Sequence, residues 1–294
     1  MERFRAKCNT VYPKRFDRDL IEGHRIVGLI AQTPSSDLYG VEKDGEIAVL
    51  KALGPTIIWT MNICSVNRFK REVEIMSRLN HPNVPSVLWK GDIGVIASFI
   101  MEYVDGEDLT ALIKKGLKWE DAVRIFIEFT KTLEAVHGQG ILHRDIKPGN
   151  LLIRDGKAVI VDFGISYSGQ VEGSRDIIQT NGSGFATMGG ICGTIQYTPP
   201  EWGLIAANRR ITRDIYSSGV MLYEMVSGVL PFNETDLNDI VAAHSRAAIP
   251  LLRKNKPDLD APSSLDIIIA KAMAKKPEDR FQTMKEMRDA LESV

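Results

Sequence analysis

The sequence predicts an α+β protein in which a small, β-rich part precedes a larger, mainly helical part. Strand-like patterns prevail up to Val104, and amphipathic helical patterns prevail after Gly106. Of the 294 residues, 44% are apolar and 26% are charged, which is typical of globular proteins and argues against a disordered or fibrous chain. We therefore expect an extension at residues 1–24, a small lobe at 25–104 and a large lobe at 105–294.

Turn signals such as Lys43-Asp44-Gly45 separate the strand-like segments of the small lobe. One helix interrupts them, because apolar residues recur at intervals of three and four between Val66 and Leu79. The extension before them is basic and irregular, and it predicts no regular element. The predicted strands are Arg25–Ile30, Leu38–Glu42, Ile47–Ala52, Ser86–Trp89 and Gly94–Glu102.

The large lobe combines helices with two short β segments, Leu151–Arg154 and Ala158–Val161. Residues 166–190 are rich in glycine and serine and predict a long loop, and loops of that length are often functional. One helix, Thr212–Ser227, is apolar around most of its circumference, as a central buried helix would be. The other predicted helices are Asp108–Lys115, Trp119–His137, Thr235–Ala247, Ser263–Ala274 and Thr283–Ser293.

Charge, apolar runs and cysteines argue against several classes of protein. The 37 Lys and Arg residues and the 38 Asp and Glu residues nearly cancel, so no general electrostatic case exists for binding nucleic acid. The longest apolar run, residues 93–101, is far shorter than the about 20 residues that span a bilayer. Cys8, Cys64 and Cys192 lie far apart, without metal-ligand spacing. We expect a reduced, cytoplasmic protein without membrane insertion.

The most specific motif is His-Arg-Asp-Ile-Lys-Pro-Gly-Asn at residues 143–150. It is followed, after an apolar strand, by Asp162-Phe163-Gly164. These motifs resemble those of the eukaryotic-type (Hanks-type) serine/threonine protein kinases. The resemblance runs from about residue 25 to the C-terminus. It implies a bilobal fold with a small antiparallel sheet and one helix in the N-lobe and a mainly helical C-lobe.

The resemblance implies transfer of the ATP γ-phosphate to Ser or Thr hydroxyl groups of protein substrates. Asp145 would accept the proton of the attacking hydroxyl, and Lys147 would meet the γ-phosphate charge. Asn150 and Asp162 would supply oxygen ligands for Mg²⁺, with Mn²⁺ as the alternative metal. Lys147 also favours the Ser/Thr branch over the tyrosine-specific one. The alternative interpretation of residues 143–150 is a solvated polar turn without a catalytic role.

Lys51 ends the strand Ile-Ala-Val-Leu-Lys, which resembles the Val-Ala-Ile-Lys of the family, and would contact the α- and β-phosphates. Glu72 is its expected partner, because a carboxylate on an apolar helix stripe needs a counter-charge. Glu74 is the competing candidate. The apolar residues that the resemblance places around ATP have an alternative role, which is packing in the protein core. By resemblance, Met101 lies at the rear of the ATP pocket, Glu102 and Val104 meet the adenine edge, Asp108 meets the ribose, and Leu38, Ala48 and Leu152 form apolar walls.

Residues 193–201 resemble the end of an activation segment, with Pro-Pro-Glu where the family has Ala-Pro-Glu. By resemblance, Thr194 would contact the catalytic loop and help to dock the substrate. Glu201 would pair with Arg280, and Asp214 would hold the catalytic loop through hydrogen bonds to its backbone. The last two roles are structural rather than chemical.

Arg144 directly precedes the catalytic Asp145, an arrangement that in the family accompanies control by a phosphate on the activation segment. The preferred acceptor is Thr187, and an unmodified loop is the alternative. Such control implies autophosphorylation, with self-association if it occurs in trans. The other acceptor candidates are Ser174, Thr180 and Ser183.

The phosphate-covering loop departs from the three-glycine pattern of the family. Counting back from Leu38, the glycine positions hold Ala31, Thr33 and Ser36, and a second register would use Gly28 as the first glycine. Glycine lets backbone N–H groups approach phosphate oxygens, so side chains here should hinder that approach. The hydroxyl groups of Thr33 and Ser36 could partly substitute as donors. We expect altered nucleotide binding rather than its loss.

Two other hypotheses follow from the same residues. The unusual loop motivates a pseudokinase, a nucleotide-binding scaffold with weak or no transfer activity. The four residues Lys51, Asp145, Asn150 and Asp162 oppose it, because a scaffold has no chemical need of all of them. A kinase for a small molecule is the third hypothesis, and the peptide-docking segment 193–201 disfavours it.

Overall fold

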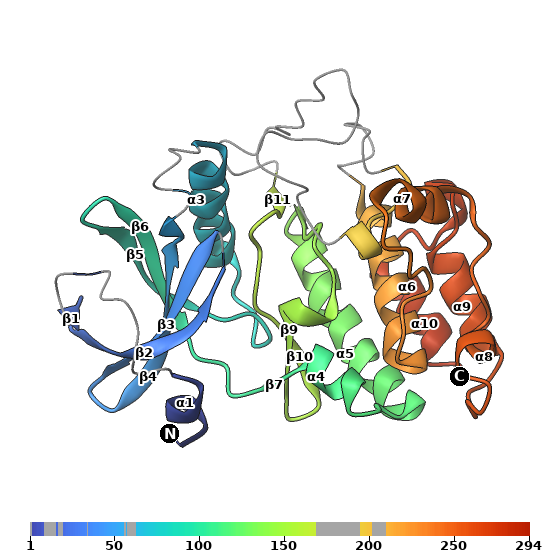
Figure 1. The fold of residues 1–294 in the computed structure, drawn as a ribbon, viewed down its shortest axis with the longest axis horizontal. Coiled ribbons are helices and arrows are strands. Elements are labelled where there is room, and N and C mark those ends of the chain that lie inside the picture. The colour runs from blue at the N-terminus through green and yellow to red at the C-terminus, as the bar shows by residue number, and fades with distance from the viewer. Residues whose placement is uncertain are drawn as a thin grey trace. The chain divides into compact units, whose positions relative to one another are not determined.

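The computed structural model describes residues 2–8, 16, 20–33, 35–55, 57, 63–168, 195–201 and 210–294. The chain divides into two compact units, Met1–Asp105 and Gly106–Val294. Figure 1 shows a sheet and one long helix in the first unit and most of the helices in the second. The α+β class predicted from the sequence is therefore confirmed.

The first unit is built on a six-stranded antiparallel sheet with the order β1-β2-β3-β4-β6-β5. The β3–β4 hairpin turns at Asp44 and Gly45, whose φ angles of 53° and 84° match the positive values of a type I′ turn. The strands are β1 (Leu20–Ile21), β2 (His24–Gln32), β3 (Ser36–Lys43), β4 (Glu46–Leu53), β5 (Val87–Ile93) and β6 (Ile96–Glu102).

The two faces of this sheet carry different partners. One face holds an apolar cluster that includes Tyr39, Val41 and Leu50. The opposite face packs against helix α3 (Ile63–Arg78), where the ring of Phe69 lies 5.5 Å from that of Phe99 on β6. The predicted amphipathic pattern therefore buries one stripe of α3 against the sheet.

The N-terminal extension is more ordered than the sequence predicts. Residues Glu2–Lys7 form helix α1, and Leu20–Ile21 form strand β1, so the prediction of an irregular extension is wrong for these segments. A helix of six residues with one deeply buried apolar side chain, Phe4, has no readable period. Such a helix depends on packing against the rest of the fold, which local sequence does not reveal.

The second unit is mainly helical, with two small sheets, β10-β9-β7 and β11-β8. Its strands are β7 (Glu107–Asp108), β8 (Ile141–Leu142), β9 (Leu151–Arg154), β10 (Lys157–Ile160) and β11 (Tyr167–Ser168). Its α-helices are α4 (Leu109–Lys114), α5 (Trp119–Gly138), α6 (Ile211–Ser227), α7 (Leu237–Arg246), α8 (Leu252–Asn255), α9 (Ser264–Ala272) and α10 (Met284–Leu291).

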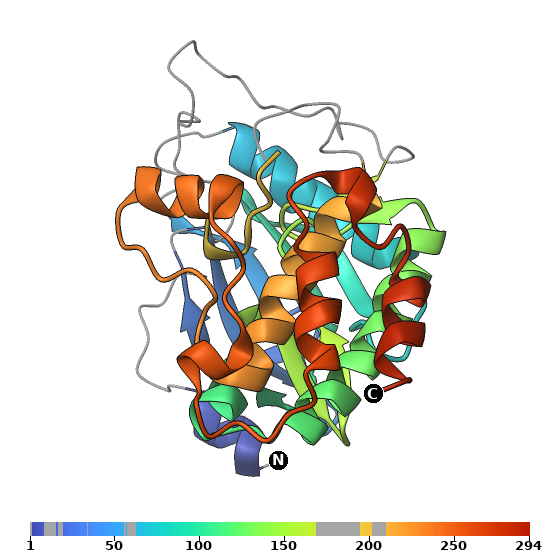
Figure 2. The same cartoon turned by 90° about the vertical axis from the view of Figure 1, so that its right-hand side faces the viewer.

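Helix α6 is buried along nearly its whole length, as its apolar circumference predicts. It packs against α5 and α9, and Figure 2 shows α6 and α9 side by side. Gly219 allows the close approach to α9, because a Cβ atom there would lie 2.8 Å from the Cβ of Ala272. Gly228 ends the helix in the left-handed conformation, with φ of 83°. Among the described residues, no helix is long and apolar enough to cross a membrane.

Candidate active site

Lys51 and Glu72 form a buried ion pair in the first unit. Lys51 Nζ on β4 lies 2.6 Å from Glu72 Oε1 on α3, and their side chains are only 8% and 3% exposed. Removing one partner of such a pair costs about 3–5 kcal/mol, because the other charge stays buried without compensation. The competing candidate, Glu74, has a side chain that is 46% exposed, and it pairs with Lys90 at 2.8 Å. The structure thus joins the two side chains that the sequence analysis paired.

The alternation of β4 corrects the prediction for Ala48. Leu38 is the cross-strand partner of Lys51, and Gly40 is the partner of Val49, so these four residues share one face. Ala48 belongs to the apolar cluster on the opposite face. The prediction that Ala48 lines the same pocket as Leu38 and Lys51 is therefore wrong. Val49, two residues before the lysine, holds that place.

The turn between β2 and β3 uses its hydroxyl groups internally. Thr33 Oγ1 accepts a hydrogen bond from Ser36 N and donates one to Ser36 O, both at 2.9 Å. A hydroxyl has one proton to donate, so this turn consumes the Thr33 donor that the sequence analysis offered to a phosphate. Ala31, at the first glycine position, pairs with Leu38 across the hairpin.

The end of β6 and the segment after it contain the residues expected to border adenine. Met101 is buried and lies across from Val49, on the face that carries Lys51. Glu102 donates its backbone N–H to Ser86 O at 2.9 Å, and Val104 is buried. These contacts fix the strand end up to the last residues of the first unit.

The catalytic-loop motif forms a compact polar cluster in the second unit. Asp145 Oδ2 accepts hydrogen bonds from Lys147 Nζ at 2.8 Å and from Asn150 Nδ2 at 2.9 Å. The same amide donates to the carbonyl of Asp145 at 2.8 Å. A partly exposed carboxylate is thus held in one orientation by a cation and an amide. This arrangement suits a group that must accept a proton from a positioned hydroxyl.

Asp214 anchors this loop from the first turn of α6. Its carboxylate accepts hydrogen bonds from the backbone N–H groups of His143 and Arg144 and contacts His137 Nε2, each at 2.8 Å. Burial alone would raise the pKa of Asp214, but His137, His143 and the Arg144 N–H lower it to about 2. The anchor holds Arg144 at φ of 69°, in the left-handed region that side chains rarely adopt.

The Asp162-Phe163-Gly164 motif lies next to this loop. Val161 N donates a hydrogen bond to the carbonyl of Asn150 at 3.0 Å. This bond joins the residue directly before Asp162 to the loop that carries Asn150. The ring of Phe163 is buried and packs 5.0 Å from that of His143. Burial lowers the pKa of His143, which favours the neutral form of this ring, although the nearby carboxylates of Asp214, Asp145 and Asp162 oppose the shift.

Asp108 and Leu152 are neighbours in the small sheet β10-β9-β7, where they are cross-strand partners. Asp108 Oδ1 also caps helix α4 by accepting a hydrogen bond from Ala111 N at 3.0 Å. Arg144 stacks on Tyr167, with its guanidinium 4.5 Å from the ring centroid. Sequence reasoning did not assign the cap or the stack.

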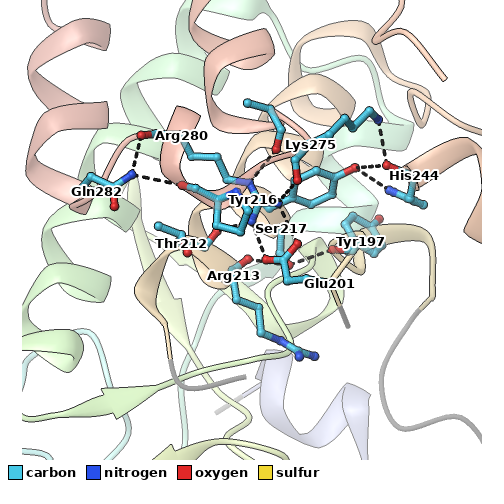
Figure 3. A network of polar contacts seen from close by, with 12 residues as sticks. Tyr197, Glu201, Thr212, Arg213, Tyr216, Ser217, His244, Lys275, Arg280 and Gln282 are labelled. Atoms are coloured by element: carbon cyan, nitrogen blue, oxygen red, sulfur yellow. Dashed lines mark hydrogen bonds and ion pairs between the residues drawn. The ribbon is translucent and has the colours of Figure 1, made fainter. Parts of the chain in front are cut away.

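Glu201 and Arg280 form a two-bond ion pair at the end of the segment that the sequence predicts to be the activation segment (Figure 3). The distances are 2.7 Å and 2.8 Å, and the Arg280 side chain is fully buried. The same guanidinium donates to backbone carbonyls of Thr212, Ala274 and Lys275. This fork joins three segments of the unit. Thr187 and Thr194, together with Ser174, Thr180 and Ser183, lie outside the described residues.

Comparisons with known proteins agree with this geometry. Residues 38–291 match the family model described as the protein kinase domain. The chain belongs to the protein kinase family.

Several bacterial kinases resemble this one. A "probable serine/threonine-protein kinase" of Clostridium perfringens is 38% identical over 233 residues, which cover 78% of this chain and 32% of that protein. The serine/threonine-protein kinase pkn3 of Myxococcus xanthus is 31% identical over 257 residues, covering 85% and 45%. PrkC of Bacillus subtilis is 33% identical over 227 residues, covering 76% and 33%. The chain thus spans less than half the length of these curated relatives.

The comparisons confirm the resemblance drawn from the two motifs, and with it the bilobal kinase fold class. Kinases of this family generally use ATP and a divalent metal ion. The donor set of this chain fits such an ion. Both hydrogen bonds of the Asn150 amide use its nitrogen, which leaves the amide oxygen unconsumed by them, and Asp162 adds a carboxylate. Hard divalent cations prefer such oxygen ligands.

The kinase also contains interacting residues that sequence reasoning missed. Tyr197 donates a hydrogen bond to Glu224 on α6 at 2.5 Å. Burial raises the pKa of Glu224, and the Tyr197 hydroxyl opposes that rise. No local pattern links two residues so far apart in the sequence. Val49 could have been found, because strand alternation counted back from Lys51 places it on the same face.

Proposed function

We propose that this chain is a serine/threonine protein kinase that transfers the γ-phosphoryl group of ATP to hydroxyl groups of protein substrates. The names of its relatives support this activity. The observation that carries the proposal is the clamped carboxylate of Asp145, held by Lys147 and Asn150 on a loop anchored by Asp214. The cytoplasm, where ATP is available, is the proposed site of action.

In the proposed mechanism Asp145 accepts the proton of the substrate hydroxyl as the hydroxyl oxygen attacks the γ-phosphorus. The bond from the γ-phosphorus to the bridging oxygen of the β-phosphate breaks, and ADP leaves. Lys147, already 2.8 Å from that carboxylate, places a positive charge where negative charge develops. Lys51 binds the α- and β-phosphates, and Glu72 fixes its amine. Asn150 and Asp162 are the residues that would hold Mg²⁺, or Mn²⁺ in its place. When bound, the metal neutralises phosphate charge.

The remaining site residues keep the roles that the resemblance implies. Glu102 and Val104 bind the adenine edge through their main-chain groups, with Met101 behind them. Asp108 binds the ribose through the oxygen that does not cap α4, which its half-exposed position supports. Leu38, Val49 and Leu152 contact the base, and Val49 replaces Ala48 in that role.

The test is radiolabel transfer from ATP to a generic basic protein, with the full chain and the variant Asp145→Asn. Loss of a general base costs typically about 10²–10⁴-fold in rate. The matched control is Asp121→Asn, which removes an exposed carboxylate paired with Arg124 on α5. We expect the control to retain activity and phosphoserine or phosphothreonine to be the product. Absence of transfer by the unaltered chain with both Mg²⁺ and Mn²⁺ would overturn the proposal.

We further propose that the kinase phosphorylates its own activation segment, with Thr187 as the preferred acceptor. The half-buried residue Arg144, beside the catalytic Asp145, supports phosphate recognition near this loop. Mass spectrometry of residues 166–194 after incubation with ATP should locate the phosphate. A rate per molecule that rises with protein concentration would show transfer between two copies. Unmodified peptides from an active kinase would refute this part alone.

A further inference from the structure

Helix α1 lies against the segment that follows β6 in the first unit. The ring of Phe4 meets the ring of Tyr103 edge to face, with centroids 4.8 Å apart and an interplanar angle of 76°. Arg3 approaches Asp105 at 4.0 Å, and Lys7 Nζ lies 5.6 Å from the centroid of Tyr103. The helix therefore contacts the segment 102–105, called the connector below, through three of its side chains.

The sheet is shaped to receive this helix. Gly40 on β3 lies directly across from Gly28 on β2, so two neighbouring positions lack side chains. A Cβ atom at Gly40 would lie 2.8 Å from Phe4 Cζ and would also collide with Cys8 Sγ. Phe4 is only 1% exposed and Cys8 7%. The space that a side chain at position 40 would fill is thus taken by α1 and the residue after it.

This contact borders the proposed nucleotide site. Gly40 lies on the same sheet face as Leu38 and Val49, the two residues assigned to contact the base. Tyr103 stands between Glu102 and Val104, whose main-chain groups are assigned to the adenine edge. Phe4 therefore contacts both the part of the sheet assigned to the base and the connector assigned to bind the adenine edge.

We propose that Phe4 is a positioning residue for adenine binding, acting through Tyr103 to fix the main-chain groups of Glu102 and Val104. This inference rests on the proposed function. A connector that is already ordered loses less conformational freedom when the nucleotide binds, so affinity increases without a new contact to ATP. The contribution concerns nucleotide binding and not the transfer step.

The closing experiment titrates the full chain with a fluorescent ATP analogue in the presence of Mg²⁺. Phe4→Ala removes the aromatic contact, and Gly40→Ala displaces α1 from the side of the strand. Because an aromatic pair contributes about 0.5–1.5 kcal/mol, we expect Phe4→Ala to weaken nucleotide binding roughly fivefold. Phe4→Leu, which keeps most of the apolar volume, should restore part of the affinity. KM for ATP should rise while kcat and KM for the protein substrate stay unchanged.

The matched control is Phe16→Ala. Phe16 belongs to the same N-terminal segment and is 7% exposed, but it packs on Tyr39, on the opposite face of the sheet. Thermal unfolding of each variant measures the stability loss that both substitutions share. Phe16→Ala should destabilise the protein and leave nucleotide affinity unchanged.

The outcomes separate the two claims. Equal affinities of Phe4→Ala and the unaltered chain would overturn the inference and leave the kinase assignment standing. An equal loss of affinity in Phe16→Ala would also overturn it, because the effect would then follow stability alone. Nucleotide binding that depends on Phe4 without any phosphoryl transfer would support the inference and overturn the proposed activity. An unaltered chain that binds no nucleotide would overturn both.

Discussion

Replacing Asp214 tests how the catalytic loop is held. The carboxylate accepts three bonds of 2.8 Å, two of them from the backbone N–H groups of His143 and Arg144. Asp214→Ala leaves these buried donors without an acceptor, and each such group costs about 1–3 kcal/mol. We therefore expect a loss of about 2–5 kcal/mol in the free energy of unfolding. Asp214→Asn keeps one acceptor oxygen and should lose about half as much.

Urea unfolding of the full chain measures this loss, and radiolabel transfer measures its effect on activity under conditions where each variant is folded. Arg144 needs the anchor to hold its left-handed backbone, so the folded Asp214→Ala variant should transfer phosphate far more slowly than the unaltered chain. A variant that is folded and fully active would refute the argument. A stability loss below about 1 kcal/mol would refute the hydrogen-bond accounting.

The same anchor predicts a dependence on pH. The pKa of Asp214 is about 2 in the folded chain, below the ordinary value of 3.8. Between these two values, the unfolded chain binds more protons than the folded chain does. The stability contributed by Asp214 is therefore present above about pH 4 and is lost as the pH falls toward 2. Between pH 5 and pH 2, the free energy of unfolding should fall less steeply with pH for Asp214→Asn than for the unaltered chain.

Three further substitutions probe buried polar pairs. Glu72→Gln leaves the buried amine of Lys51 without its counter-charge and should cost about 3 kcal/mol of stability, measured by urea unfolding, and raise KM for ATP. Glu201→Gln halves the fork to a fully buried arginine and should cost a similar amount, about 3 kcal/mol, with unchanged melting as the refuting result. Tyr197→Phe removes a hydrogen bond that favours the ionised form of Glu224, so its stability loss should be larger at pH 8 than at pH 5. An equal loss at both pH values would contradict that assignment.

The long helices and the polar motifs were readable from the sequence because their signals are local. Helix α5 was expected at Trp119–His137 and is observed at Trp119–Gly138. The pairing of Glu72 with a lysine followed from a carboxylate on an apolar stripe, which is costly to bury alone. In each case a physical cost within a short stretch limits what the chain can do.

Other features depend on contacts between distant residues and left no local signal. Helix α1 exists because Phe4 finds the space above Gly40, thirty-six positions along the chain. Thr33 closes its turn with its hydroxyl, although the phosphate-loop pattern had suggested another use for that group. Matching the letters of the family motif places Ala48 on the wrong face of the sheet, whereas strand alternation selects Val49.

Helix α6 supports the two segments of the second unit to which we assign catalysis and substrate docking. Its Asp214 accepts a hydrogen bond from the backbone of the loop that carries Asp145. Its Thr212 carbonyl accepts a hydrogen bond from Arg280, which also pairs with Glu201 at the end of the predicted activation segment. Its Glu224 accepts a hydrogen bond from the hydroxyl of Tyr197, which lies near the same end of that segment. Phosphoryl transfer needs mainly positioning and charge stabilisation, so a rigid buried helix is a suitable support for it. Burying these polar groups costs free energy. The hydrogen bonds between the paired donors and acceptors offset that cost only when both segments are packed against α6. The loop that carries Asp145 and the segment that ends at Glu201 are therefore expected to lose their order together when α6 is disturbed.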